Sequence, residues 1–346
     1  MCAAANRRRF RSTVILRDVC MGSIVAAGRR TARIAAIRSV RHNPDEAPTG
    51  AGACRVTIIA VTAAQPGAGK TGVAAAIARA LAYSGRPTRL VRLAEPGSRA
   101  AEDARWYSGL EFAPGSPAEP LAGVPEAAAG EVLVVECGAG AVPAGAVVVA
   151  VARGAGAAAP PANAAAVVQL AVPGVRGVQV QSGPPLHIQA GEDRTLAGFA
   201  LDEALRLLHA EVLLPGGLPE DTTSDHLVIA PIGSDAGQPY FLRFPSMTVV
   251  ARFDRTDLHL AALRASPNAL ILTGGRHPSG YTLDAASASG VPLVLSRTDT
   301  ENTVIALERV FEGTRFRGER KLDRMSELLA GTGLFEALQQ PIPATA

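Results

Sequence analysis

The residues of this chain with the clearest chemical potential are ten consecutive ones, TAAQPGAGKT, at positions 62–71. They include Lys70, which with Lys321 makes up the only two lysines among 34 basic residues. The apolar run VTIIAV at 56–61 precedes them, and GVAAAIARALAY at 72–83, rich in strong helix formers, follows. This order of strand, glycine-rich loop, Gly-Lys-Thr and helix predicts a loop that binds phosphate.

The residue types explain that chemistry. Gly67 and Gly69 permit backbone conformations closed to other residues, so consecutive N–H groups can point at phosphate oxygens at the start of a helix. Lys70 is expected to reach the β- and γ-phosphates, and the hydroxyl of Thr71 to bind Mg²⁺. The usual first glycine of this pattern is Ala64 here, and the alternative interpretation is a helix that begins after a glycine-rich turn without a ligand. The predicted nucleotide contacts in the loop are Gly67, Ala68, Gly69, Lys70, Thr71 and Gly72.

Two carboxylates are candidates for the metal, beside Thr71. Glu136 ends the apolar run at 131–135, and a carboxylate there needs a cation or a hydrogen-bond partner. If that strand lies beside the first one, Glu136 points at the phosphates, and we predict catalytic roles for Lys70 and Glu136. Asp103 is the second candidate, because a Mg²⁺ site takes one or two carboxylates beside phosphate oxygens. The alternatives are a strand-end acid in solvent for Glu136 and an ordinary acid near a helix N-terminus for Asp103.

Length and composition bound the fold. The 346 residues exceed the usual size of one domain, so we expect about two. Aromatic residues make up only 4%, so Ala, Val and Leu must fill the cores, which suits helices packed on a parallel sheet. The four cysteines show no C-x-x-C spacing, which argues against a metal or disulfide framework and favours the cytoplasm. No uncharged apolar run is long enough to span a membrane, so we expect no membrane partner.

The net charge of +3 is unevenly distributed. Residues 1–53 hold ten arginines and three acidic residues, a net +7 that leaves −4 for the remainder. This segment is similar to an organellar transit peptide in its arginine content. We predict instead a disordered basic leader, with the true start of the protein at Met21 or later as an alternative. We do not expect a nucleic acid as partner.

Short apolar runs alternate with helical patterns along the rest of the chain, which predicts an α/β fold with parallel sheets. In the first half, strands are expected at 56–61, 88–93, 131–135, 146–152 and 177–181. In the second half, a helix is expected at 201–214, strands at 227–231, 247–252, 269–273 and 291–295, and helices at 257–265, 282–288, 300–311 and 317–330. The predicted domains are a leader at 1–53, a nucleotide-binding domain at 54–195, a second α/β domain at 196–335 and a tail at 336–346.

Residues 56 to about 195 resemble the dethiobiotin synthetase-like branch of P-loop proteins. The resemblance rests on the loop at 62–71, on EDAR at 102–105 and on VECGAG at 135–140, which is similar to the Glu-Gly-Ala-Gly-Gly turn of that family. It implies a P-loop fold that binds ATP and Mg²⁺. The contacts it implies for phosphate and metal are Lys70, Thr71, Asp103 and Glu136.

Two positions depart from that family. Its lysine after the second strand stands here as Arg92, and its adenine-reading asparagine stands as Gln181. Arginine keeps the charge but cannot act as a compact, titratable amine. We therefore predict Arg92 as a contact for a substrate or effector and Gln181 as a contact for adenine.

The second domain resembles the DRTGG domain. DRTD at 254–257, ALILTGG at 269–275 and GVPLVL at 290–295 follow the order of that family, although Asp257 and Leu258 stand where two glycines are expected. Glycines at a strand end allow close approach of a ligand or of another backbone, so a tight turn without a ligand is the alternative. The predicted substrate or effector contacts here are Asp254, Arg255, Thr256, Thr273, Gly274 and Gly275.

This order of two domains is similar to the amino-terminal regulatory region of long bacterial phosphate acetyltransferases. We do not expect acetyl transfer, because their catalytic domain would need far more chain than follows residue 330. The leading hypothesis is a cytoplasmic Mg-ATP-binding protein that regulates acetyl-phosphate or related carbon metabolism, with the DRTGG-like domain as sensor or assembly element. The alternative is an ATP-dependent ligase that phosphorylates a carboxylate or carbamate held by Arg92. We expect a homodimer in either case, and the sequence leaves the effector, the substrate and ATP hydrolysis open.

Overall fold

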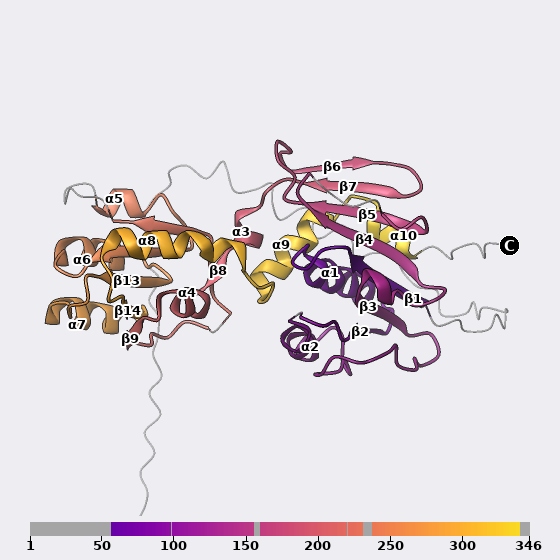
Figure 1. Cartoon of the computed structure of the whole chain (residues 1–346), viewed down its shortest axis with the longest axis horizontal. Helices are drawn as coiled ribbons and strands as arrows, with labels where there is room; N and C mark the ends of the chain where they lie inside the picture. Colours follow the sequence, from indigo (N-terminus) through magenta and orange to yellow (C-terminus); the bar gives the residue numbers. More distant parts are fainter. Residues whose placement is uncertain (1–56, 98, 156–159, 220, 231–236, 340–346) are drawn as a thin grey trace, which may run out of the picture. The chain divides into compact units, whose positions relative to one another are not determined.

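The computed structural model describes residues 57–97, 99–155, 160–219, 221–230 and 237–339. The predicted leader at 1–53 and residues 340–346 of the predicted tail lie outside the described residues. The described chain has the α/β architecture that the sequence predicts, with a larger, mostly parallel sheet and a second, smaller α/β region (Figure 1).

Seven strands of the described chain form the larger sheet, in the order β2-β3-β1-β4-β5-β7-β6. Neighbouring strands are parallel except at the edge, where β6 runs antiparallel to β7. The central position of β1 places the glycine-rich loop that follows it between the carboxyl ends of β3 and β4. The strands are β1 Thr57–Ala63, β2 Thr88–Arg92, β3 Val132–Gly138, β4 Val147–Arg153, β5 Ala164–Leu170, β6 Val178–Gln181 and β7 Leu186–Ala190.

The sequence predicted five of these strands and missed two. The bounds of β1 to β4 and of β6 differ from the predictions by at most three residues. The missed strand β5 begins in a run of alanines that carries little β-propensity, and β7, LHIQA, is too short for a clear alternation. Pairing with β4 and with β5 fixes these two segments as strands, so tertiary context overrides local preference.

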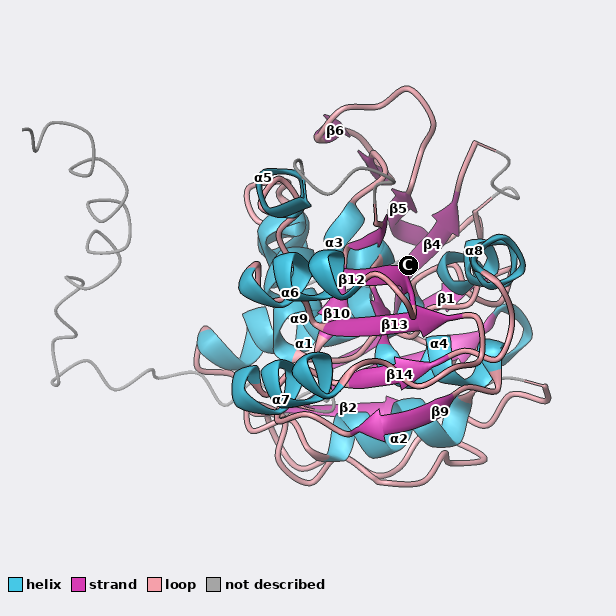
Figure 2. Ribbon diagram, turned by 90° about the vertical axis from the view of Figure 1, so that its left-hand side faces the viewer, coloured by secondary structure: helices cyan, strands magenta, loops and turns pink. Residues whose placement is uncertain are grey.

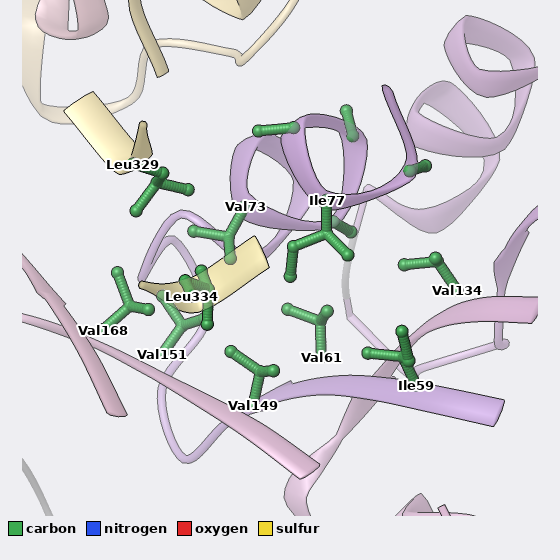
Figure 3. Packing of buried hydrophobic residues seen from close by; sticks show 14 of the residues in the cluster. Ile59, Val61, Val73, Ile77, Val134, Val149, Val151, Val168, Leu329 and Leu334 are labelled. Carbon is green, nitrogen blue, oxygen red and sulfur yellow. The ribbon is translucent and has the colours of Figure 1, made fainter. Parts of the chain in front are cut away.

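Helix α1, Lys70–Tyr83, packs on one face of the larger sheet. Val73 and Ile77 on the helix face Ile59 and Val61 on β1, together with valines of β3, β4 and β5 (Figure 3). All four side chains are completely buried. Because alanine and valine fill this core, the helix lies close to the sheet and holds its first residue, Lys70, at the end of β1.

The C-terminal helices α9, Glu319–Leu329, and α10, Leu334–Gln339, complete the same core. Leu322, Met325 and Leu329 are buried with the residues of α1 and the larger sheet. Most of these residues lie inside the predicted second domain at 196–335. The boundary near 195 stays a prediction. The packing shows that the chain returns to the core of the larger sheet after residue 318.

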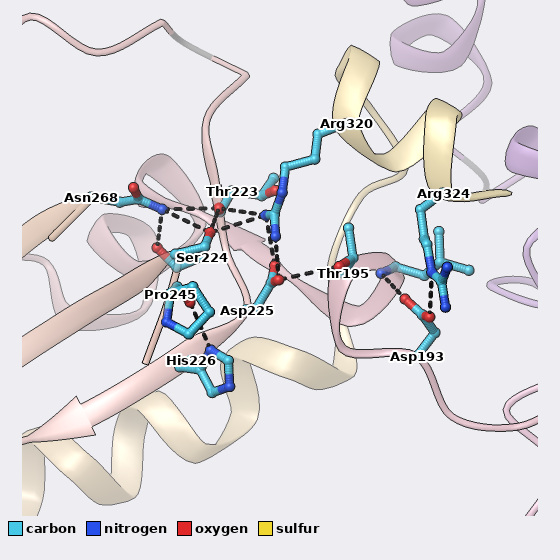
Figure 4. Close-up of polar contacts among 12 residues, drawn as sticks. Asp193, Thr195, Thr223, Ser224, Asp225, His226, Pro245, Asn268, Arg320 and Arg324 are labelled. Atoms are coloured by element: carbon cyan, nitrogen blue, oxygen red, sulfur yellow. Dashed lines mark hydrogen bonds and ion pairs between the residues drawn. The ribbon is translucent and has the colours of Figure 1, made fainter. Parts of the chain in front are cut away.

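Arginine side chains attach α9 to segments near the smaller sheet and near the end of β7 (Figure 4). Arg324 Nε donates to Asp193 Oδ2 at 2.7 Å, and Arg320 donates to both carboxylate oxygens of Asp225. Thr195 Oγ1 also donates to Asp225, at 3.2 Å. Asp193 caps the short helix α3, Arg194–Ala197, by accepting from the backbone N–H of Leu196. These bonds fix the turn at the carboxyl end of β7.

The smaller sheet has the order β11-β12-β13-β14-β9 in the described residues, parallel except for β9. Figure 2 shows β13, β14 and β9 side by side. Helices α5, α6 and α7 cover one face, and α4 and α8 cover the other. Its elements are α4 Leu201–Leu208, β9 Glu211–Leu214, β11 His226–Ile229, α5 Gly237–Phe241, β12 Met247–Arg252, α6 Thr256–Arg264, β13 Ala269–Thr273, α7 Gly280–Ser289, β14 Leu293–Leu295 and α8 Thr300–Glu308.

Short elements join these regions, and one predicted helix is wrong in its second half. Strands β8, Phe199–Ala200, and β10, Thr223–Ser224, pair with each other. The helix predicted at 201–214 ends at Leu208, because His209 adopts a left-handed conformation with φ 46°, and the remainder forms β9 against β14. Helix α2, Ala100–Ser108, is absent from the predicted elements, although the alternative for Asp103 placed that residue near a helix N-terminus. Two 3₁₀ helices are η2 Ala139–Ala141 and η3 Arg309–Glu312.

The helices within the described residues are short or carry polar side chains. None of them combines the length and the apolar character that crossing a bilayer requires.

Removal of a large α9 side chain should destabilise the core between the larger sheet, α1 and α9. Leu322 is completely buried, so Leu322→Ala should lower the free energy of unfolding by about 2–5 kcal/mol, as for other buried leucines. Urea unfolding measures this loss. Leu242→Ala is the control, because Leu242 is 64% exposed and its removal should cost less than about 0.5 kcal/mol. Equal losses in the two variants would show that α9 does not belong to this core.

Candidate functional site

A cavity of about 420 Å³ lies at the carboxyl ends of the parallel strands of the larger sheet. Its volume is in the range of small-molecule sites, and this edge is where open α/β sheets bind ligands. The glycine-rich loop forms one wall, the ends of β2, β3, β5 and β7 form others, and the segment before α9 completes it. The lining includes residues 66–71, Arg92, Glu95, Asp103, Glu136, Arg153, 190–193 and 312–316.

The glycine-rich loop has the backbone that its sequence predicts. Gly67 and Gly69 adopt φ values of 72° and 100°, which only glycine takes up readily. A Cβ atom at Gly69 would also lie 2.6 Å from Leu170 Cδ1, so space excludes a side chain there. Helix α1 begins directly afterwards at Lys70, and its first turn contains no acidic side chain. The free N–H groups and the partial positive charge at its N-terminus are therefore not neutralised by a side chain of the helix itself.

The amine of Lys70 is buried in the cavity wall. The side chain is 5% exposed, and Nζ donates to Glu95 Oε2 at 3.0 Å. Burial acts to raise the pKa of Glu95, but hydrogen bonds from Arg92 and Lys70 outweigh it and hold that pKa below its ordinary value. Glu95 is not among the site residues predicted from the sequence. The available signal was its position just after β2, because the carboxyl ends of neighbouring parallel strands meet at one edge.

Arg92 lies at the centre of the acidic residues. Its Nη2 donates to Glu95 Oε2 at 2.9 Å, and its Nε lies 3.5 Å from Glu136 Oε1 and 3.6 Å from Asp103 Oδ2. Burial acts against the charged guanidinium, but Glu136 and the other carboxylates outweigh it and raise the pKa of Arg92. The predicted substrate contact is therefore a permanent cation held by three acids.

Glu136 is 1% exposed, and each of its carboxylate oxygens accepts a hydrogen bond. Because β3 pairs with β1, Glu136 lies opposite Val61, as expected if the two strands are neighbours. Thr71 Oγ1 donates to Glu136 Oε1 at 3.2 Å, and the hydroxyl of Tyr107 donates to Oε2 at 2.6 Å. Burial, followed by the charge of Glu136, raises the pKa of Tyr107 well above its ordinary value, so the phenol remains a donor. Nothing in the sequence pointed to Tyr107, which comes from the unpredicted helix α2.

Asp103, also on α2, and Glu136 both lie close to Nε of the Arg92 guanidinium, at 3.6 and 3.5 Å. Burial raises the pKa of Asp103 to about 7; the negative charge of Glu136 adds to the rise and Arg92 opposes it. A carboxyl group of this kind is partly protonated near neutral pH. The site therefore contains one acid that titrates in the physiological range.

The predicted Mg²⁺ ligands fit in part. Thr71 and Glu136 present hydroxyl and carboxylate oxygens 3.2 Å apart, which are hard donors of the kind Mg²⁺ prefers. Asp103 Oδ2 lies 3.6 Å from Arg92 Nε, as Glu136 Oε1 does at 3.5 Å, and a role of Asp103 as metal ligand stays a prediction. Within the described ranges there is no group of three or more His, Cys, Asp or Glu side chains able to hold a metal ion. Phosphate oxygens and water would therefore have to supply most of the ligands of a metal here.

Gln181 lies away from this cavity. Strand β6 is antiparallel to β7, and Gln181 pairs with His187 near the amino end of β7. The chain direction thus carries Gln181 to the edge of the sheet opposite the glycine-rich loop, and it is not among the residues that line the cavity. Ala171 and Gly191, which follow β5 and β7, line the cavity instead.

The predicted contacts of the second region gather at one edge of the smaller sheet. Thr256 Oγ1 lies 3.1 Å from Ser279 Oγ, and Thr273 Oγ1 lies 2.7 Å from Thr300 Oγ1. Arg255 donates to both carboxylate oxygens of Asp257, at 3.0 and 2.8 Å. These polar groups satisfy one another in the structure.

The two glycines that follow Thr273 have φ values of 98° and 67°. The N–H groups of Gly274 and Gly275 donate to the carbonyl oxygens of Thr298 and Ser296. The nearby Asp254 is paired with Arg252 at 2.8 Å. The glycines therefore make a strand-to-strand contact here, and a role of this edge in effector binding stays a prediction.

Comparison with known proteins identifies the second region. The DRTGG domain family matches residues 203–310, so a DRTGG domain is present there. Among solved structures, the chain is similar to the CBS and DRTGG domains of the regulatory region of Clostridium perfringens pyrophosphatase, a structure that contains the activator diadenosine tetraphosphate. The identity is 17%, the TM-score is 0.30, and the match covers 34% of this chain and 48% of that one. The chain thus spans about half the length of that structure.

The titration of Asp103 should make the free energy of unfolding fall as the pH rises. Its pKa is about 7 in the folded chain against an ordinary 3.8, so between these values the folded protein keeps a proton that the unfolded chain has released. The contribution of this proton to the free energy of unfolding is complete below about pH 4 and is lost as the pH passes about 7. Asp103→Asn keeps a neutral side chain, so its melting temperature relative to wild type should rise between about pH 5 and about pH 8.

The exposed Asp284 provides the control for this measurement, because Asp284→Asn makes the same change of charge on the surface of α7. Its melting temperature relative to wild type should be almost independent of pH. The same pH trend in both variants would show that Asp103 titrates as an ordinary acid.

Proposed function

We propose that the chain binds Mg-ATP in the cavity of the larger sheet, through a P-loop formed by residues 62–71. The observation that carries this proposal is the convergence of a buried amine, two left-handed glycines and the start of α1 on one cavity wall. Inward N–H groups, a helix N-terminus and an ammonium group are the means by which proteins bind polyphosphate. The alternative, a helix that begins after a glycine-rich turn without a ligand, accounts for the backbone of the loop but gives no role to the cavity beside it.

Further cations support a polyphosphate ligand. Arg99, Arg153 and Arg315 also line the cavity. Arg315 pairs with Glu102 at 3.2 Å, and Arg99 donates to the carbonyl oxygen of Gly313 at 2.9 Å. Arg153 is exposed at the end of β4, beside the glycine-rich loop. A triphosphate carries enough negative charge to interact with several such side chains.

In this proposal Mg²⁺ accompanies the nucleotide, with Thr71 and Glu136 as its protein ligands, directly or through water. Such an ion would neutralise negative charge on the phosphate oxygens. Thr71 supplies a hydroxyl at the start of α1, and Glu136 supplies a carboxylate that Tyr107 and Arg92 hold in place. The roles of these chain residues are binding and orientation.

For the DRTGG domain we propose a sensor or assembly role, and for the whole chain a regulatory role in acetyl-phosphate or related carbon metabolism. The match to residues 203–310 supports the first part, and the order of the two regions supports the second. A physical connection also favours communication. Glu203, at the start of the match, accepts from the backbone N–H of Arg315 at 2.9 Å, and Arg315 lines the cavity.

The ligase hypothesis receives less support. It needs Arg92 to hold an acid substrate, yet Glu95, Asp103 and Glu136 already surround its guanidinium. An acid substrate would have to compete with three carboxylates for one cation. We therefore favour nucleotide binding with a regulatory outcome.

Loss of the buried amine should weaken ATP binding. Lys70→Ala removes a charge-assisted contact worth about 1.5–3 kcal/mol, so the Kd for ATP should rise about 10- to 100-fold. Isothermal titration calorimetry of the full chain measures this change. Arg264→Ala removes a cation exposed on α6 and should leave the Kd unchanged. Equal ATP affinity in wild type and Lys70→Ala would remove the proposal.

The hydroxyl of Thr71 should carry the dependence on metal. Wild type should bind ATP more tightly with Mg²⁺ than with a chelator, and Thr71→Val, which keeps the shape but lacks the oxygen ligand, should lose most of that gain. The same titrations with Thr57→Val, at the other end of β1, provide the control. An undiminished Mg²⁺ effect in Thr71→Val would contradict the assigned ligand.

A further inference from the structure

One carboxylate oxygen connects the two buried cations of the site. Glu95 Oε2 accepts from Lys70 Nζ at 3.0 Å and from Arg92 Nη2 at 2.9 Å. An oxygen that bridges an ammonium and a guanidinium group has the surroundings of a phosphate oxygen in a protein site. Here the chain itself supplies that oxygen.

The fold makes room for this side chain. A Cβ atom built on Gly138, at the end of β3, would lie 2.9 Å from Glu95 Oε1, so a side chain at 138 would displace the carboxylate. Glu95 is itself 26% exposed and lines the cavity. Its carboxylate therefore lies between buried cations on one side and the open cavity on the other, where a ligand can reach it.

The strand order identifies which part of a nucleotide meets Glu95. On the β2 and β3 side of the glycine-rich loop, the cavity ends against large buried side chains, those of Arg92 and Glu136. On the β5 and β7 side, it is lined by small residues, Ala171, Ala190 and Gly191. The small side chains leave more room for a nucleoside on the second side. The polyphosphate then runs along the loop, and its terminal phosphate arrives beside Glu95.

We infer that Glu95 occupies the position of a terminal phosphate oxygen and thereby determines how well the site discriminates nucleoside triphosphates from diphosphates. This inference rests on the proposed function. A γ-phosphate must displace the Glu95 carboxylate from Lys70, because two anionic oxygens cannot share one bridging position. A diphosphate ends short of that position and leaves the contact in place. Glu95 therefore weakens binding of ATP more than binding of ADP.

Arg92 keeps its position when Glu95 is changed. Its Nη1 donates to the carbonyl oxygen of Leu93 at 2.8 Å, and its Nε lies 3.6 Å from Asp103 Oδ2 and 3.5 Å from Glu136 Oε1. Removal of the Glu95 charge should therefore leave Arg92 in place and free the Lys70 ammonium group to meet a phosphate oxygen. A role of Glu95 as a metal ligand, or as the residue that orients Lys70, predicts the opposite sign, since its loss would then weaken ATP binding.

The test compares the Kd values of ATP and ADP, each with Mg²⁺, for wild type, Glu95→Gln and Glu95→Asp by calorimetry. Glu95→Gln keeps the shape without the charge, and the Kd for ATP should fall about tenfold, the effect of one charge-assisted contact. The Kd for ADP should change by less than about threefold. Glu95→Asp keeps the charge but is one methylene shorter, so an intermediate gain for ATP is expected.

Glu131→Gln is the matched control. Glu131 forms an equivalent ion pair with Arg89, at 3.0 Å, but does not line the cavity, so its Kd values should equal those of wild type. The inference is overturned if Glu95→Gln binds ATP no better than wild type, or if its affinities for ATP and ADP rise by the same factor. If neither nucleotide binds wild type or variant, the proposed function fails and the inference fails with it. Thermal melts of each variant establish that it is folded.

Discussion

Charges buried at the carboxyl edge of the larger sheet must neutralise one another, and the geometry of the site depends on that balance. Lys70 and Arg92 meet Glu95, Asp103 and Glu136 where solvent is scarce, so each group needs a partner of opposite sign. Burial and the negative charge of Glu136 raise the pKa of Asp103 to about 7, against the opposing effect of Arg92. A polyphosphate brings further negative charge and therefore has to rearrange this network when it binds.

The parts of the structure that the sequence predicted follow from strong local rules. The loop at 62–71 carried its own constraints, because glycines with positive φ and a helix that begins at Lys70 leave few alternatives. The apolar runs of β1 to β4 identified a parallel sheet, and that topology brings Glu136 beside Thr71. The DRTGG resemblance of the second region was confirmed over residues 203–310.

What the sequence could not supply depends on contacts between distant segments. Tyr107 and Asp103 reach the site on a helix whose polar sequence gave no apolar stripe, and the guanidinium of Arg92 lies within 3.6 Å of both Asp103 and Glu136. The strand direction of β6 removes Gln181 from the cavity, which no local pattern reveals. The return of α9 to the core of the larger sheet likewise depends on packing against α1, because its amphipathic face is compatible with either region.

The most direct measurement is a crystal structure of the full chain with Mg²⁺ and a non-hydrolysable ATP analogue. The account predicts phosphate density along the loop at 66–71, with Lys70 Nζ about 3 Å from a phosphate oxygen and no longer bonded to Glu95. Arg92 should remain beside Asp103 and Glu136. An analogue bound elsewhere, or a Lys70–Glu95 contact left intact with no phosphate beside the loop, would contradict the account.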